Sequence, residues 1–156
     1  MRLLRVGPPG LERPAVLDAD GGAHDLSPLT DDIDGAFLAG GGLDRARAAL
    51  TEGLRPRIEI AGQRTGAPVA RPGKVVCVGL NYVDHAAETA TPPPAEPVVF
   101  MKAANTVVGP DDTVLIPRTS VKTDYEIELA IVIGRTARYL DSEDAADEVI
   151  AGYAIA

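Results

Sequence analysis

The chain has 156 residues, of which 46% are hydrophobic and 24% are charged, a balance that allows a packed core and argues against a disordered protein. The formal net charge of −8 argues against nucleic acid as a partner, because phosphate binding requires a surplus of Lys and Arg. The single cysteine, Cys77, excludes an internal disulfide and is expected to be a buried thiol. No stretch has the length and apolarity of a membrane span, so we expect a cytoplasmic protein without a membrane partner.

The first 70 residues predict a small α/β domain. Residues 1–6 alternate weakly as a strand, and residues 14–18 and 23–26 flank the turn Asp20-Gly21-Gly22, which is a hairpin signal. Residues 31–38 and 43–50 carry apolar side chains at helical spacing, with a glycine turn at 40–42 between the two helices. Residues 57–60 are expected to form a short strand, and 68–73 a linker.

The rest of the chain predicts mostly strands. We expect them at residues 75–78, 97–102, 106–108, 113–116 and 125–133, with a turn at 109–112. Ser142 is the candidate N-cap of a short helix, and 152–156 resembles the beginning of an apolar strand. Because complete domains seldom stop inside a buried strand, we expect the chain to be truncated.

Two glutamates stand two residues apart in the run Tyr125-Glu126-Ile127-Glu128. In a strand this spacing places both carboxylates on one face, roughly 6.6 Å apart at the backbone. Their mutual repulsion is about 2 to 3 kcal/mol at an effective dielectric constant near 20, and a divalent cation would reverse that sign. The pair is therefore either a site for Mg²⁺, Mn²⁺ or Ca²⁺ or a solvated face of an edge strand.

A histidine and a glutamate are three residues apart in the segment that follows the strand at 75–78. His85 and Glu88 would share one face of a short helix, which Asn81 could cap. A histidine oriented by a carboxylate is a usable general base near neutral pH, although a surface His–Glu pair has the same spacing. Lys102, at the end of the strand at 97–102, is either an anchor for a substrate carboxylate or a solvated lysine. His24 shows no partner in the sequence and is expected to be structural.

Three blocks of this sequence, residues 74–88, 96–102 and 124–134, resemble the fumarylacetoacetate hydrolase (FAH) family in order and in spacing. The resemblance covers residues 72–156 closely, and residues 1–70 resemble the variable N-terminal domain of bacterial members. It implies an α+β, mostly β fold: a rolled mixed β-sheet catalytic domain over 71–156, incomplete here, with a small N-terminal α/β domain over 1–70. A homodimer is the usual assembly in the family.

The resemblance also implies a role for each candidate residue. Glu126 and Glu128 would be metal ligands, usually for Mg²⁺ and sometimes for Mn²⁺ or Ca²⁺. His85 and Glu88 would form a dyad that activates water. Three further residues would contact the substrate, namely Lys102, Asn81 and Tyr82. The family's third metal carboxylate and a catalytic lysine would lie past Ala156, so we expect this chain to be inactive by itself.

The implied activity is metal-dependent hydrolysis of a C–C bond in a 2-oxo acid or 1,3-diketone, of the acylpyruvate or fumarylpyruvate type. A cation chelated by the neighbouring substrate oxygens would stabilise the enolate that forms when the bond breaks. One alternative is a decarboxylase or isomerase of the 2-hydroxyhepta-2,4-dienedioate type, acting in aromatic catabolism through the same enolate. The other is a non-catalytic fragment.

Overall fold

The computed structural model describes residues 1–53 and 56–156, and it confirms the α+β class with more strands than helices. Two compact units are present: Met1–Ala70 with Val108–Ala156, and Arg71–Val107. In the described residues no helix is both long and apolar enough to cross a membrane. The predicted two-domain division near residue 70 stays a prediction.

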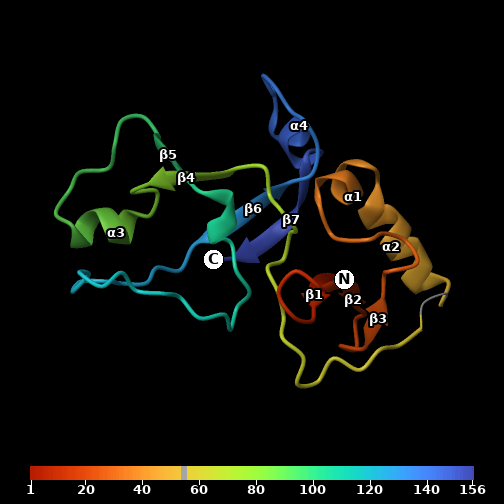
Figure 1. Cartoon of the computed structure of the whole chain (residues 1–156). Coiled ribbons are helices and arrows are strands. Elements are labelled where there is room, and N and C mark those ends of the chain that lie inside the picture. Colours follow the sequence, from red (N-terminus) through yellow and green to blue (C-terminus); the bar gives the residue numbers. More distant parts are fainter. Residues whose placement is uncertain (54–55) are drawn as a thin grey trace. The chain divides into compact units, whose positions relative to one another are not determined.

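The N-terminal strands form a three-stranded antiparallel sheet in the order β1-β2-β3 (Figure 1). β1 is Arg2–Val6, β2 is Arg13–Leu17 and β3 is Ala23–Asp25. The β2–β3 turn confirms the hairpin predicted from Asp20-Gly21-Gly22, and Gly21 adopts the positive φ of 83° that the turn requires. His24 lies on β3 and has a partner that the sequence did not reveal, because its Nε2 lies 2.9 Å from Asp18 Oδ2.

Two helices lie beside this sheet and supply its core (Figure 1). α1 is Gly35–Ala39 and α2 is Gly42–Thr51. The first helix begins later than predicted because Asp34 is its N-cap, with the side chain accepting from the Phe37 amide at 3.0 Å. A buried cluster joins sheet and helices through side chains that are at most 3% exposed: Val16, Leu26, Ile33, Phe37 and Ala46.

The predicted strand at residues 57–60 is wrong. Arg57 makes one antiparallel bridge to His24, and the following residues make no ladder with the described strands. β3 has only three residues, so there is little edge for another strand to extend along.

The second part of the larger unit holds a two-stranded antiparallel ladder. β6 is Leu129–Ile133, β7 is Ile150–Ile155, and α4, Glu143–Asp147, lies between them in sequence. The predicted N-cap is confirmed, since Ser142 Oγ accepts from the Ala145 amide at 3.1 Å. The predicted strand at 125–133 begins too early in the sequence, because the pairing with β7 starts only at the Glu128–Ala156 pair.

The smaller unit is an antiparallel pair with a short helix in the connection. β4 is Val75–Gly79, β5 is Val98–Lys102 and α3 is Val83–Glu88. Cys77 on β4 is half-buried rather than fully buried, because one two-stranded ladder cannot cover both of its faces.

Two further strand predictions are wrong. Thr106 ends a 3-10 turn, η1, at Ala104–Thr106, where its amide and hydroxyl both donate to the Ala103 carbonyl. Residues 113–116 form no ladder with the described strands and leave their apolar side chains exposed. In both places β-propensity was present but a partner strand was not.

Candidate active site

The segment that carries the predicted dyad turns sharply out of β4. Leu80, directly after the strand, has a φ of 53°, and Tyr82 is the N-cap of α3. The prediction that Asn81 caps this helix is wrong, because the turn at Leu80 moves the first helical residue to Val83. Asn81 and Tyr82 therefore lie exposed at the entrance to the helix, where their predicted role in substrate binding stays a prediction.

His85 and Glu88 both belong to α3, and their spacing of three residues places them on one side of the helix. His85 is half-buried, next to Ala86, which is 1% exposed, whereas Glu88 at the last helical position is exposed. The His85 carbonyl accepts from both the amide and the hydroxyl of Thr89, each at 3.1 Å, which closes the helix. The water-activating role of the pair stays a prediction.

Lys102 lies in the same unit as the dyad but at the other end of its ladder. The register pairs Lys102 with Val75, whereas the chain leaves for α3 after Gly79, which pairs with Val98. An offset of four residues along β4 separates these ends, roughly 13 Å along the ladder. If Lys102 contacts the substrate, it would therefore contact a different part of it than His85 and Glu88 on α3 would.

The acidic pair lies at the start of β6, in the larger unit. Glu128 exchanges two backbone hydrogen bonds with Ala156, at 2.8 and 2.9 Å, so its backbone is held as the first rung of the ladder. Glu128, Ala130 and Val132 are half-buried, whereas Leu129 and Ile131 between them are exposed. Glu128 thus belongs to the less exposed face of β6, and Glu126 lies in the exposed run just before it.

The donor atoms of the pair fit a hard divalent cation. Both side chains offer only carboxylate oxygens, the ligands that Mg²⁺ and Mn²⁺ prefer. The described residues form no group of three or more His, Cys, Asp or Glu side chains that could hold a metal ion. Two carboxylates supply part of a coordination shell, and in magnesium sites water and substrate oxygens commonly complete it.

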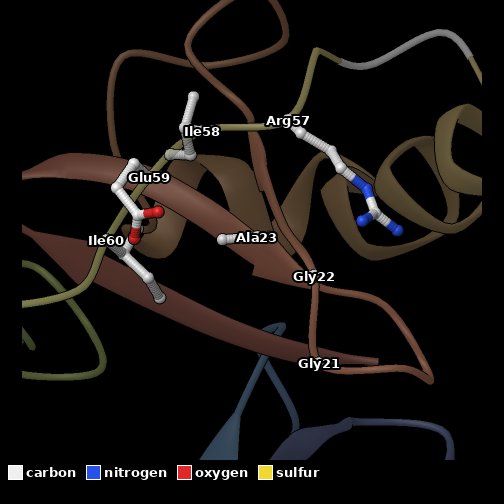
Figure 2. A pocket seen from close by; sticks show the side chains of 7 residues that line it. All are labelled: Gly21, Gly22, Ala23, Arg57, Ile58, Glu59 and Ile60. Atoms are coloured by element: carbon white, nitrogen blue, oxygen red, sulfur yellow. The ribbon is translucent and has the colours of Figure 1, made fainter.

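A pocket of about 380 Å³ lies elsewhere, beside the β2–β3 turn (Figure 2). The side chains of Arg57 and Glu59 lie on opposite sides of Ala23 in this view, and no predicted site residue lines the pocket. Asp18 next to it accepts from two backbone amides of the turn, and its Oδ2 lies 3.4 Å from Arg57 Nη2. Asp18 was not among the predicted site residues, although an aspartate just before an Asp-Gly-Gly turn is typical of turn-closing residues.

Sequence comparison matches the chain to one protein family and to curated relatives. Residues 74–156 match the sequence model of the family described as "Fumarylacetoacetate (FAA) hydrolase C-terminal". A protein of Burkholderia multivorans, provisionally named a hydrolase, is 48% identical over 155 residues, covering 99% of this chain and 54% of that protein. A Burkholderia ambifaria protein with a similar provisional name is 47% identical over the same length and the same shares of both chains.

Solved structures share the fold across almost all of this chain. A Mycobacterium smegmatis protein provisionally named HpcE is 31% identical with a TM-score of 0.79, over 99% of this chain and 53% of that chain. Maleylpyruvate hydrolase from Sphingobium sp. SYK-6, in complex with manganese(II) and pyruvate, is 29% identical with a TM-score of 0.74, over 99% of this chain and 57% of that one. The chain spans about half the length of the curated relatives it matches. It belongs to the fumarylacetoacetate hydrolase family.

Proposed function

We propose that the protein is a metal-dependent hydrolase that cleaves a C–C bond in a 2-oxo acid of the acylpyruvate or fumarylpyruvate type. The observation that carries this proposal is the likeness over nearly the whole chain to maleylpyruvate hydrolase, a structure that holds manganese(II) and pyruvate. Pyruvate is the product that hydrolysis of any acylpyruvate must release. The oxygen-only donors Glu126 and Glu128 suit the same class of cation.

The proposed metal ligands are Glu126 and Glu128, for which Mg²⁺, Mn²⁺ and Ca²⁺ are the candidate ions. A divalent cation bound there would polarise the substrate carbonyl groups and stabilise developing negative charge. The backbone bonds between Glu128 and Ala156 support the proposal, because they limit the movement of one ligand. Without the cation, two carboxylates so close in sequence would repel each other.

The proposed chemistry on α3 is general-base catalysis. His85, with Glu88 on the same side of the helix, would take a proton from water, and the resulting hydroxide would add to the acyl carbon. Breakage of the C–C bond gives a carboxylic acid and the enolate of pyruvate, which then gains a proton. Lys102, Asn81 and Tyr82 would bind the charged and polar ends of the substrate.

The purified full-length protein tests the proposal through loss of the diketone absorbance of an acylpyruvate, with Mg²⁺, with Mn²⁺ and with a chelator. We expect E128Q to lower both metal affinity and hydrolysis, by about 10-fold to 100-fold or more, because a neutral amide is a weaker ligand.

His85→Ala should lower hydrolysis by about 100-fold to 10,000-fold while leaving metal affinity unchanged. Glu143→Gln, on α4, is the matched control and should change neither.

The products separate the remaining alternatives. A hydrolase releases pyruvate and a carboxylic acid in equal amounts, whereas a decarboxylase releases CO₂ and an isomerase changes only the spectrum. Turnover that survives both the chelator and the E128Q substitution would contradict the metal site. Metal binding without any turnover would favour the non-catalytic fragment.

A further inference from the structure

A chain of five charged side chains with alternating sign runs through the larger unit. Arg5 donates to both oxygens of Asp32, at 2.6 and 3.0 Å, and its Nη2 lies 3.4 Å from Glu12 Oε2. Glu12 Oε1 in turn accepts from Arg64 at 2.9 Å, and Arg64 binds Asp112. Arg5 is 8% exposed and the Glu12 side chain 7%, so these charges are not a solvated surface pair.

The last link joins residues that are 48 positions apart in the sequence. Arg64 donates to both oxygens of Asp112, from Nε at 2.6 Å and from Nη2 at 2.5 Å. Asp112 Oδ2 also accepts from the Gly109 amide at 2.7 Å, and the Asp112 amide donates to the Gly109 carbonyl at 3.2 Å. The aspartate therefore closes the turn at 109–112 and binds Arg64 with the same carboxylate.

The backbone makes a second, independent contact at the same place. A Cβ added to Gly109 would lie well inside van der Waals contact with the Thr65 carbonyl oxygen and 3.1 Å from Gly66 Cα. Thr65 bridges to Val6 of β1, and the Gly66 amide donates to the Arg5 carbonyl at 2.7 Å. The turn thus lies directly against a segment that is itself bound to the edge of the N-terminal sheet.

We propose that Arg64, Glu12 and Asp112 form a latch that docks the turn at 109–112 onto the backbone at Thr65 and Gly66. Through the latch, the N-terminal region also fixes the position of the turn from which the chain continues toward β6. It depends on the paired geometry of the guanidinium group, which a lysine cannot reproduce. It does not depend on the proposed catalytic function.

The charge states agree with a closed latch at neutral pH. Hydrogen bonds from Arg64, followed by the one from the Gly109 amide, hold the pKa of Asp112 below its usual range. Burial alone would raise the pKa of Glu12, but hydrogen bonds from Arg64 and from backbone amides, with the charge of Arg5, lower it overall. Both carboxylates are therefore ionised opposite Arg5 and Arg64, with Asp32 completing the chain.

Hydrogen exchange followed by mass spectrometry on the full chain tests the latch. Peptides that span 106–114 report on the turn, and peptides from β1 and β2 serve as the internal reference. We expect D112N and Arg64→Lys each to speed exchange in the turn by about tenfold or more, while the reference peptides stay within about twofold. Gly109→Ala should give the same local increase by steric displacement, with all five charges retained.

Asp111→Asn is the matched control, because Asp111 is the exposed neighbour in the same turn and carries the same charge. It should leave exchange in the turn unchanged. Equal exchange in wild type, D112N and R64K would overturn the proposal. So would an increase that is equally large in the turn and in β1 and β2, because it would mean that the pair supports only global stability.

Discussion

Asp18 binds several partners at the β2–β3 turn. Its Oδ1 accepts from the amides of Asp20 and Gly22, at 3.0 and 2.7 Å, and its Oδ2 faces His24 and Arg57. The hydrogen bond with His24, followed by the one from the Gly22 amide, holds the pKa of Asp18 below its usual range. Because every partner favours the ionised carboxylate, the stability that the turn contributes depends on pH.

The sign of this coupling gives a prediction for Asp18→Asn. A carboxylate whose pKa is lowered by folding stabilises the protein above its unfolded pKa, near 4, and this stability is lost as pH falls through the lowered value. We therefore expect the variant to be less stable than wild type at pH 7 and to approach it in stability near pH 2. Urea unfolding at a series of pH values measures the stability of the variant and of the wild type.

Asp20→Asn is the control, because Asp20 lies in the same turn and uses its backbone amide, not its side chain, in the bond to Asp18. Its stability should follow wild type at each pH. A D18N variant whose urea midpoint runs parallel to wild type from pH 7 to pH 2 would contradict the coupling.

The glycine corner between α1 and α2 shows how two short helices pack at close range. Gly41, the N-cap of α2, has a φ of 72°, and Gly42 begins the helix directly beneath the ring of Phe37. A Cβ at Gly42 would overlap both the Phe37 ring and its carbonyl oxygen. Gly35, at the first position of α1, has open space around it.

Replacing these two glycines by alanine should change the free energy of unfolding differently. Gly42→Ala should lower the free energy of unfolding by about 1 to 3 kcal/mol, because the Phe37 ring must leave its place in the core. Gly35→Ala should leave it unchanged or raise it by about 0.4 to 1 kcal/mol, because alanine restricts the unfolded chain and meets no atom in the fold. Chemical denaturation of both variants gives the comparison, and a Gly42→Ala variant as stable as wild type would show that the corner is not tightly packed.

On the scale of the whole molecule, the ladders outside the N-terminal sheet expose large apolar side chains. On β6–β7 the register places Leu129 opposite Ile155 and Ile131 opposite Tyr153, and all four side chains are more than half exposed. Cross-strand partners point to the same face, so these residues form one continuous apolar surface. Such a surface, beside an unprotected strand edge, favours association.

We therefore expect the purified chain to associate as its concentration rises, and the double substitution of Ile131 and Tyr153 by threonine to weaken that association by about tenfold or more. Threonine keeps the β-propensity of the ladder while removing apolar area. Sedimentation velocity over a range of concentrations measures the effect. Val114→Thr, which alters an equally exposed residue outside the strands, should leave the association as it is in wild type. A wild-type chain that stays monomeric at every concentration would refute the prediction.

Local signals in the sequence were sufficient to predict the elements that are held by interactions between residues close in the sequence. The hairpin at Asp20-Gly21-Gly22, the turn between the two helices and the cap at Ser142 are confirmed, although Gly42 already belongs to α2 and only Gly40 and Gly41 form that turn. Each depends on φ preferences or on hydrogen bonds between near neighbours. The resemblance of three sequence blocks was also sufficient to identify the family. The roles of the predicted site residues, His85 and Glu128 among them, stay predictions.

Only the tertiary structure decided which extended segments became strands and which charges met. Residues 113–116 have the composition of a strand, yet they form no ladder with the described strands. Arg64 binds Glu12 and Asp112, and both lie far from it in the sequence. A ladder and an ion pair both need a partner that is distant in the sequence. The position of that partner depends on how the whole chain folds, and this information is absent from any local pattern of residues.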